Sequence, residues 1–210
     1  MRSHIFSDPS DRDLVDFLVA FAAVEVFMLL FLWQRKVYDL ATAATFAYCL
    51  GLMARGKLLQ YLGVFALANF NRETSVLLAG VFLVHFFDRL PWRNYLLLAG
   101  SQVLIFLAIR LAITTIYVDA PGSTMLIRPI ENIQIFLQSP MWSLVHWTLF
   151  ALVLWLCARQ WKNTPRILRV AILVMMPALL LMYLVLGYSY EIRVFAEIYP
   201  VVWVMCAIHL

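Results

Sequence analysis

Two apolar runs of about 13 residues each, 58–70 and 76–87, flank the polar sequence Asn71-Arg72-Glu73-Thr74-Ser75. A helix of that length extends roughly 20 Å, which is less than the roughly 30 Å of a bilayer's hydrocarbon core. Charged side chains at the end of such a helix need water, a partner or a ligand. The sequence therefore predicts a short-armed helical hairpin at 58–87 whose polar turn lies near one membrane surface.

The rest of the chain has the composition of a membrane protein. Of its 210 residues, 64% are hydrophobic and 13% are charged, whereas globular domains have about 45–50% apolar and about 25% charged residues. We therefore expect an all-α fold, a polytopic membrane helix bundle of about eight membrane segments. Residues 1–13 form a polar N-terminal segment, and 14–210 are predicted to form a single transmembrane helical domain.

The apolar runs set the limits of the expected segments. Besides the hairpin arms, they cover residues 14–33, 37–54, 94–117, 141–158, 170–187 and 194–210. Pro177 predicts a kink in the run 170–187. The long loop at 118–139 contains a short amphipathic piece that we expect to lie flat on the membrane surface.

The distribution of lysine and arginine predicts the orientation. Short loops that carry these residues favour the cytoplasmic side, and the connection at 159–169 carries four of them. Both termini are then cytoplasmic and the turn of the hairpin faces outward, as expected for a multi-pass protein of the bacterial inner (plasma) membrane. The cations form no continuous stripe, so nucleic acid is not an expected partner.

This topology gathers polar side chains at the outer face. Arginine binds phosphate through paired hydrogen bonds, and a carboxylate beside it stays ionised, able to orient a hydroxyl or act as a base. The candidate ligand-binding residues are Asn71, Arg72, Thr74, Arg128 and Arg193. The candidate catalytic residues are Glu73, Asp39 and Glu191. An alternative is that these charges only cap helix ends, and Arg193 with Glu197 has the i,i+4 spacing of an ion pair.

Two further charged residues lie deeper in the apolar runs. Glu25 is near the middle of 14–33 and Arg110 is in the outer half of 94–117. A buried charge needs a partner, so we predict a buried ion pair between them, with a proton or ion path as the alternative.

No metal or cofactor is predicted. His85 and His209 fall at a similar expected depth, which would permit a haem with two histidine ligands, but equal depth in two helices of about eight arises easily by chance. The cysteines have spacings that match no metal site. They are Cys49, Cys157 and Cys206.

The run from Leu67 to Leu78 resembles a recurring piece of the GT-C class of membrane glycosyltransferases, in which a small-polar-Lys/Arg-x-Thr turn joins two apolar runs. Glu191-Ile192-Arg193 followed by Pro200 is similar to the E-x-R…P segment that opens a later outer-face helix in that class. Asp39 is a third match. The resemblance covers roughly residues 37–210, and it implies a scaffold that binds a polyprenyl-phosphate sugar.

The chain departs from this class in one respect. GT-C enzymes carry the catalytic acid on a large loop between their first two spans, whereas here only Gln34-Arg35-Lys36 joins the first two apolar runs. Three aspartates near the N-terminus are predicted on the cytoplasmic side instead. They are Asp8, Asp11 and Asp13.

The favoured prediction is a reduced GT-C-like protein that binds a lipid-linked (polyprenyl-phosphate) ligand at its outer face. It would take part in glycosyl transfer with a partner membrane subunit that supplies the acid, or be an inactive relative. The first alternative is a non-catalytic structural subunit of a larger membrane complex, and the second is a small transporter. Membrane lipids are partners in each case.

Overall fold

A computed structural model describes residues 37–118, 134, 144, 151, 154, 155, 158, 159, 161–185 and 197–207. These residues form helices and turns and include no strand, which confirms the predicted all-α fold. The helices are α2 (Val37–Ala54), α3 (Leu58–Asn71), the 3-10 helix η1 (Glu73–Ser75), α4 (Val76–Phe86), α5 (Trp92–Ile116), α8 (Arg166–Val185) and α9 (Tyr199–Ala207). The segments 1–13 and 14–33, most of 141–158 and nearly all of 118–139 lie outside the described residues.

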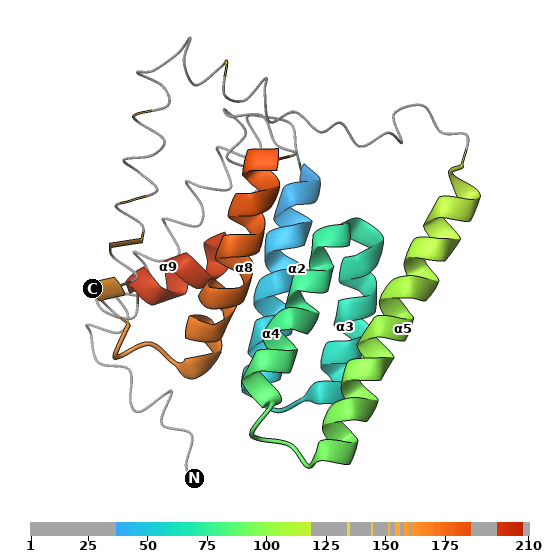
Figure 1. Ribbon diagram of the computed structural model, residues 1–210, viewed down its shortest axis with the longest axis horizontal. Coiled ribbons are helices and arrows are strands. Elements are labelled where there is room, and N and C mark those ends of the chain that lie inside the picture. The colour runs from blue at the N-terminus through green and yellow to red at the C-terminus, as the bar shows by residue number, and fades with distance from the viewer. Residues whose placement is uncertain are drawn as a thin grey trace.

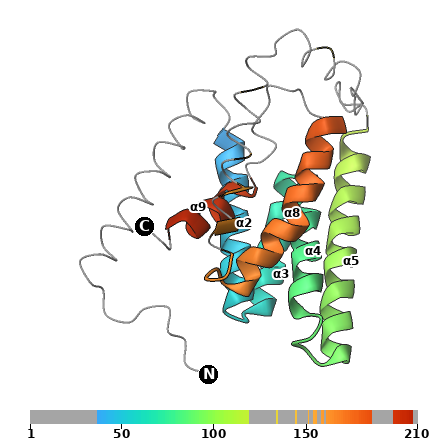
Figure 2. The same cartoon turned by 60° about the vertical axis from the view of Figure 1, so that its left-hand side comes forward.

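The hairpin predicted at 58–87 is present. Helices α3 and α4 lie side by side and antiparallel, joined by the polar turn, with α5 beside them and α8 packed against α4 (Figures 1 and 2). The helix breaks at Arg72, whose backbone is extended with φ −150° and ψ 144°. The prediction of two short arms around a turn is therefore confirmed.

The turn between α2 and α3 is closed by Gly56. Its φ of 69° lies in the left-handed region that favours glycine. The Gly56 amide donates to the carbonyl of Met53 at 3.1 Å, and the Lys57 amide donates to that of Leu52 at 3.0 Å. This is a Schellman ending, so α2 stops and the chain reverses into the hairpin within three residues.

A ladder of aromatic rings fills the core between the hairpin and α5. The Tyr61 and Phe82 rings stack with centroids 6.0 Å apart, and the Phe82 and Tyr95 rings stack at 6.1 Å. The buried Tyr61 hydroxyl donates a 2.7 Å hydrogen bond to Oε1 of Gln102 on α5. The ladder fixes the depth of the hairpin relative to α5.

Two of the described helices, Trp92–Ile116 and Arg166–Tyr183, are long and apolar enough to cross a membrane. Only 11% of the apolar window in the first is buried, so α5 presents most of its leucines outward. The described residues thus contain two such helices and the shorter apolar ones Ala41–Ala54 and Glu73–Phe86, and do not by themselves make up about eight membrane segments.

Two predicted boundaries were wrong. Helix α8 begins at Arg166 rather than at 170, because Thr164-Pro165 starts the helix and its first turns carry arginine. Helix α9 begins at Tyr199 rather than at 194, with Pro200 in its first turn, where a missing amide proton costs nothing. The apolar pattern marks where hydropathy changes, and proline marks where these helices start.

The hairpin is shorter than the helices around it. Helix α5 has 25 residues, and α3 and α4 have 14 and 11, which correspond to about 37, 21 and 16 Å. The turn of the hairpin therefore stops short of the far ends of α5 and α8 (Figures 1 and 2). Polar residues of the turn thus meet the apolar flanks of longer helices.

Candidate functional site

The turn of the hairpin is held closed by side chains that bind the free carbonyls of α3. The Ser75 hydroxyl donates a 2.8 Å hydrogen bond to the carbonyl of Ala68, and the Arg72 amide donates to the same carbonyl at 3.0 Å. The last carbonyls of a helix lack intrahelical partners. The small polar residue at 75 is therefore what allows two helices to meet in so short a turn.

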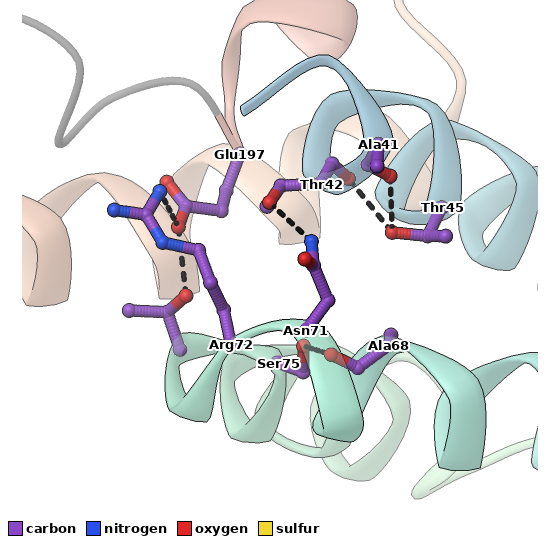
Figure 3. Close-up of polar contacts among 9 residues, drawn as sticks. Ala41, Thr42, Thr45, Ala68, Asn71, Arg72, Ser75 and Glu197 are labelled. Carbon is purple, nitrogen blue, oxygen red and sulfur yellow. Dashed lines mark hydrogen bonds and ion pairs between the residues drawn. The ribbon is translucent and has the colours of Figure 1, made fainter. Parts of the chain in front are cut away.

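Arg72 points from this turn to a carboxylate far away in the sequence. Its Nη1 lies 3.0 Å from Oε1 of Glu197, and the Thr74 hydroxyl donates a 2.7 Å hydrogen bond to the same oxygen. The Glu197 side chain is 1% exposed and that of Arg72 is 22% exposed. These two contacts anchor the turn to the segment before α9 (Figure 3).

Asn71 links the same turn to α2. Its amide nitrogen donates a 2.7 Å hydrogen bond to the hydroxyl of the buried Thr42, which precedes Thr45 by about one turn of α2 (Figure 3). The Thr45 hydroxyl donates to the backbone carbonyl of Ala41 at 2.8 Å, as threonine commonly does within apolar helices. The turn is thus tied by side chains to two other parts of the chain.

Arg110 reaches the turn from α5. Its guanidinium donates to the carbonyl of Asn69 in the last turn of α3, and its Nη1 lies 3.4 Å from Oε2 of Glu73. A cation at a helix C-terminus is favoured by the helix dipole. The Glu73 side chain is 64% exposed, so this second ion pair is at the accessible edge of the turn.

Arg110 and Asn69 each keep a shielded polar atom without a hydrogen bond among the described residues. These atoms are Nε of Arg110 and Oδ1 of Asn69, a donor and an acceptor at the same turn. Groups of this kind cost free energy unless water or a ligand meets them. The accessible edge therefore offers a cation and a carboxylate, whereas the two unsatisfied atoms are shielded from solvent.

The charges at the turn balance. Two arginines, Arg72 and Arg110, stand against two carboxylates, Glu73 and Glu197, among the described side chains. The pair of Arg72 and Glu197 is 3.0 Å apart and buried at the carboxylate, whereas the pair of Arg110 and Glu73 is 3.4 Å apart and exposed at the carboxylate. An anion at the edge would be met by Arg110, and a hydroxyl beside it by Glu73.

Of the residues predicted from the sequence, five meet at this turn: Asn71, Arg72, Glu73, Thr74 and Arg110. Arg128, Glu191, Arg193 and Glu25 lie outside the described residues, as does the side chain of Asp39. The pairing of Arg110 with Glu25 therefore stays a prediction, and the partner that the structure gives Arg110 is Glu73.

Sequence reasoning missed the main role of Glu197. It was considered only as an i,i+4 partner of Arg193, whereas in the structure it receives Arg72 and Thr74. The available signal was an acid in an apolar run three residues before Pro200, since intramembrane acids seldom lack a partner.

The part of the chain that the structure describes contains no candidate metal site. No group of three or more His, Cys, Asp or Glu side chains comes together there. His85 is buried on α4, and the predicted haem partner His209 lies outside the described residues.

Comparisons with family models, with curated proteins and with solved structures give no match to this chain.

Proposed function

We propose that this chain is a multi-pass membrane protein in which 58–87 forms a re-entrant hairpin, entering and leaving the bilayer on one side. Both feet of the hairpin lie at the same end of the bundle (Figure 1). Arms of about 16 and 21 Å are too short for a hydrocarbon core of about 30 Å. The full bundle has about eight segments and sits in a bacterial inner membrane with both termini in the cytoplasm.

The depth of the turn supports a site within the outer leaflet. Arg110, which contacts the turn, lies about 27 Å along α5 from Trp92 and about 9 Å before its end at Ile116. An arginine at that depth on an outward-facing apolar helix reaches toward lipid phosphates. The turn is therefore positioned for a ligand with an apolar tail in the bilayer and a charged head at its surface.

The ligand that fits this site is a lipid-linked phosphate, in particular a polyprenyl phosphate sugar. The observation that carries the proposal is the accessible edge of the turn, where the partly exposed Arg110 guanidinium lies 3.4 Å from the exposed carboxylate of Glu73. Arg110 binds the phosphate, Arg72 adds charge behind it, and Thr74 and Asn71 hold the turn. The sequence adds Arg128 and Arg193 as further candidate phosphate ligands, and both lie outside the described residues.

Glycosyl transfer is the reaction that the resemblance to GT-C enzymes implies. Glu73 is the carboxylate best placed to orient an acceptor hydroxyl, with Asp39 and Glu191 as further candidates. A partner membrane subunit supplies the catalytic acid if the chain is active. Without such a partner, the protein binds the lipid-linked sugar without transferring it.

A structural role in a larger membrane complex is the second candidate. The observation in its favour is the ion pair of Arg72 with the buried Glu197. The arginine of the turn thus already has a partner within the chain. In that case the turn is a packing element, and variants of it alter assembly rather than ligand binding.

Binding of a polyprenyl phosphate to the purified full-length protein in detergent separates these candidates. Removing a charge-assisted hydrogen bond costs about 1.5–3 kcal/mol, so we expect Arg110→Gln to weaken binding by roughly tenfold or more. Arg55→Gln, which removes an exposed arginine at the foot of the hairpin, is the matched control. Equal affinity for the two variants, or for the uncharged polyprenol, would rule out the phosphate site.

Cysteine labelling tests the membrane placement separately. In a background that lacks the three native cysteines, Lys57→Cys and Arg89→Cys mark the two feet, and Glu73→Cys marks the turn. A membrane-impermeant maleimide should label both feet from the cytoplasmic side and leave the turn unlabelled from that side. Labelling of the two feet from opposite sides would exclude a re-entrant hairpin.

A further inference from the structure

The end of the bundle opposite the turn is strongly basic. We define this basal end as the α2–α3 turn, the α4–α5 loop, residues 159–162 and the first turn of α8, which include the lower ends of α2, α4 and α8 in Figure 1. Among its described residues are eight cations and a single carboxylate, Asp88. The cations are Arg55, Lys57, Arg89, Arg93, Arg159, Lys162, Arg166 and Arg169.

The single carboxylate is already engaged. Asp88 accepts two hydrogen bonds from Arg166, at 2.7 and 2.9 Å, in the paired geometry typical of arginine and carboxylate. This bridge ties the α4–α5 loop to the first turn of α8. No other ion pair connects a basal cation to an acid among the described residues. The described part of the basal end therefore carries a surplus of positive charge.

Cations of the α4–α5 loop and of α8 lie around the end of α4. Arg89 lies 3.3 Å from Nε2 of His85. His85 is also within electrostatic reach of Arg166, which shares the first turn of α8 with Arg169. His85 itself is buried and its Nδ1 is shielded, so the anion-binding groups at this junction are the arginines around it.

Aromatic side chains lie at the same end of the bundle, in the α4–α5 loop and the first turn of α5 (Figure 1). Trp92 is 60% exposed, its ring stacks on Tyr95 at 5.4 Å, and the exposed Phe87 meets it edge-on at 6.3 Å. Tryptophan and tyrosine beside lysine and arginine are typical of the membrane–water interface. A nucleic acid or a soluble acidic protein would not account for outward-facing leucines directly beyond these rings on α5.

We propose that the basal end binds anionic phospholipid, with the headgroup phosphate at the junction of α4 and α8. Arg89 and Arg169 bind the phosphate, and Trp92 packs at the level of the glycerol. Arg166 is held in place by Asp88 and adds charge. The inference rests on the proposed membrane placement and is independent of ligand binding at the turn of the hairpin.

The test compares the full-length protein in nanodiscs of phosphatidylcholine with nanodiscs that also contain phosphatidylglycerol. We expect phosphatidylglycerol to raise the midpoint of thermal unfolding and to be retained by the purified protein in native mass spectrometry. Each basal cation near the surface changes lipid affinity by about fivefold, so Arg89→Gln/Arg169→Gln should lose most of both effects. High salt should also weaken the binding of phosphatidylglycerol to the protein.

Arg35→Gln/Lys36→Gln is the matched control, because it removes two cations that the sequence assigns to the opposite face. Equal losses in this control and in the basal variant would reduce the effect to net charge and overturn the proposal. Equal stability in the two kinds of nanodisc would also overturn it. Stabilisation of the detergent-solubilised protein by inorganic phosphate alone would assign the site to free anions instead of lipid.

Discussion

Nη1 of Arg72 lies 3.0 Å from Oε1 of Glu197, and this contact joins residues 125 positions apart in the chain. It fixes the turn of a short hairpin to the segment that leads into α9. The contact is buried on the side of Glu197, so its loss leaves a carboxylate with one donor fewer in a place that water does not reach.

Arg72→Ala should therefore destabilise the protein by about 3 kcal/mol, the low end for a broken buried pair, because Arg72 is partly exposed. Glu197→Gln keeps an acceptor for Thr74 and should cost less. The double variant should be more stable than the sum of the two losses predicts. Unfolding in mixed micelles measures all three, with Arg55→Ala as the control, and strict additivity would contradict a direct pair.

Gly80 lies at a close contact between α4 and α8. A Cβ built on Gly80 would lie 2.9 Å from Cγ1 of Val174, whose branched side chain has little freedom to move. We expect Gly80→Ala to destabilise the protein by roughly 1–3 kcal/mol and Val174→Ala to restore part of that loss. Gly63→Ala on α3 is the control, because no atom lies within 4 Å of its built Cβ; thermal unfolding of the two variants should differ.

Tyr61→Phe removes the hydrogen bond to Gln102 and leaves a buried amide oxygen without its donor. The expected loss of stability is about 1–3 kcal/mol. Tyr61→Phe/Gln102→Leu removes both partners and should regain much of it. Tyr48→Phe, at a tyrosine that is 58% exposed, should leave the free energy of unfolding unchanged, and a similar loss there would contradict this account.

The Asp88–Arg166 bridge predicts a dependence on acid pH. The hydrogen bonds from Arg166 lower the pKa of Asp88 below its usual value of 3.8. A lowered folded-state pKa means that the contribution is complete above about pH 4 and is lost as the pH falls through the lowered pKa. The unfolding midpoint of Asp88→Asn should therefore differ from that of the wild type at neutral pH and converge with it in acid. The difference is small, because the pair is exposed.

The local part of this fold was predictable from the sequence. The bounds 37–54 match α2, and the turn at Asn71–Ser75 lies where polar residues interrupt two apolar runs, because hydropathy and helix-breaking act over a few residues. The start of α9 was wrong by about a turn, since the apolar pattern runs through Pro200 without a change.

The ion-pair partners of the charged residues could not be predicted from local sequence patterns. Depth alone predicts a pair of Arg110 with Glu25, which lies outside the described residues, so that pairing stays a prediction. The structure brings Arg110 to Asn69 and Glu73 because α5 packs on α3. The link between Arg72 and Glu197 depends on where α9 begins, which no local pattern near Arg72 contains.

The order of synthesis adds a consequence to the contact between α4 and α8. Helix α4 packs against α8, which the ribosome makes about 80 residues later. Arms this short are poor substrates for insertion one at a time. The hairpin therefore completes its packing only after α8 has been synthesised.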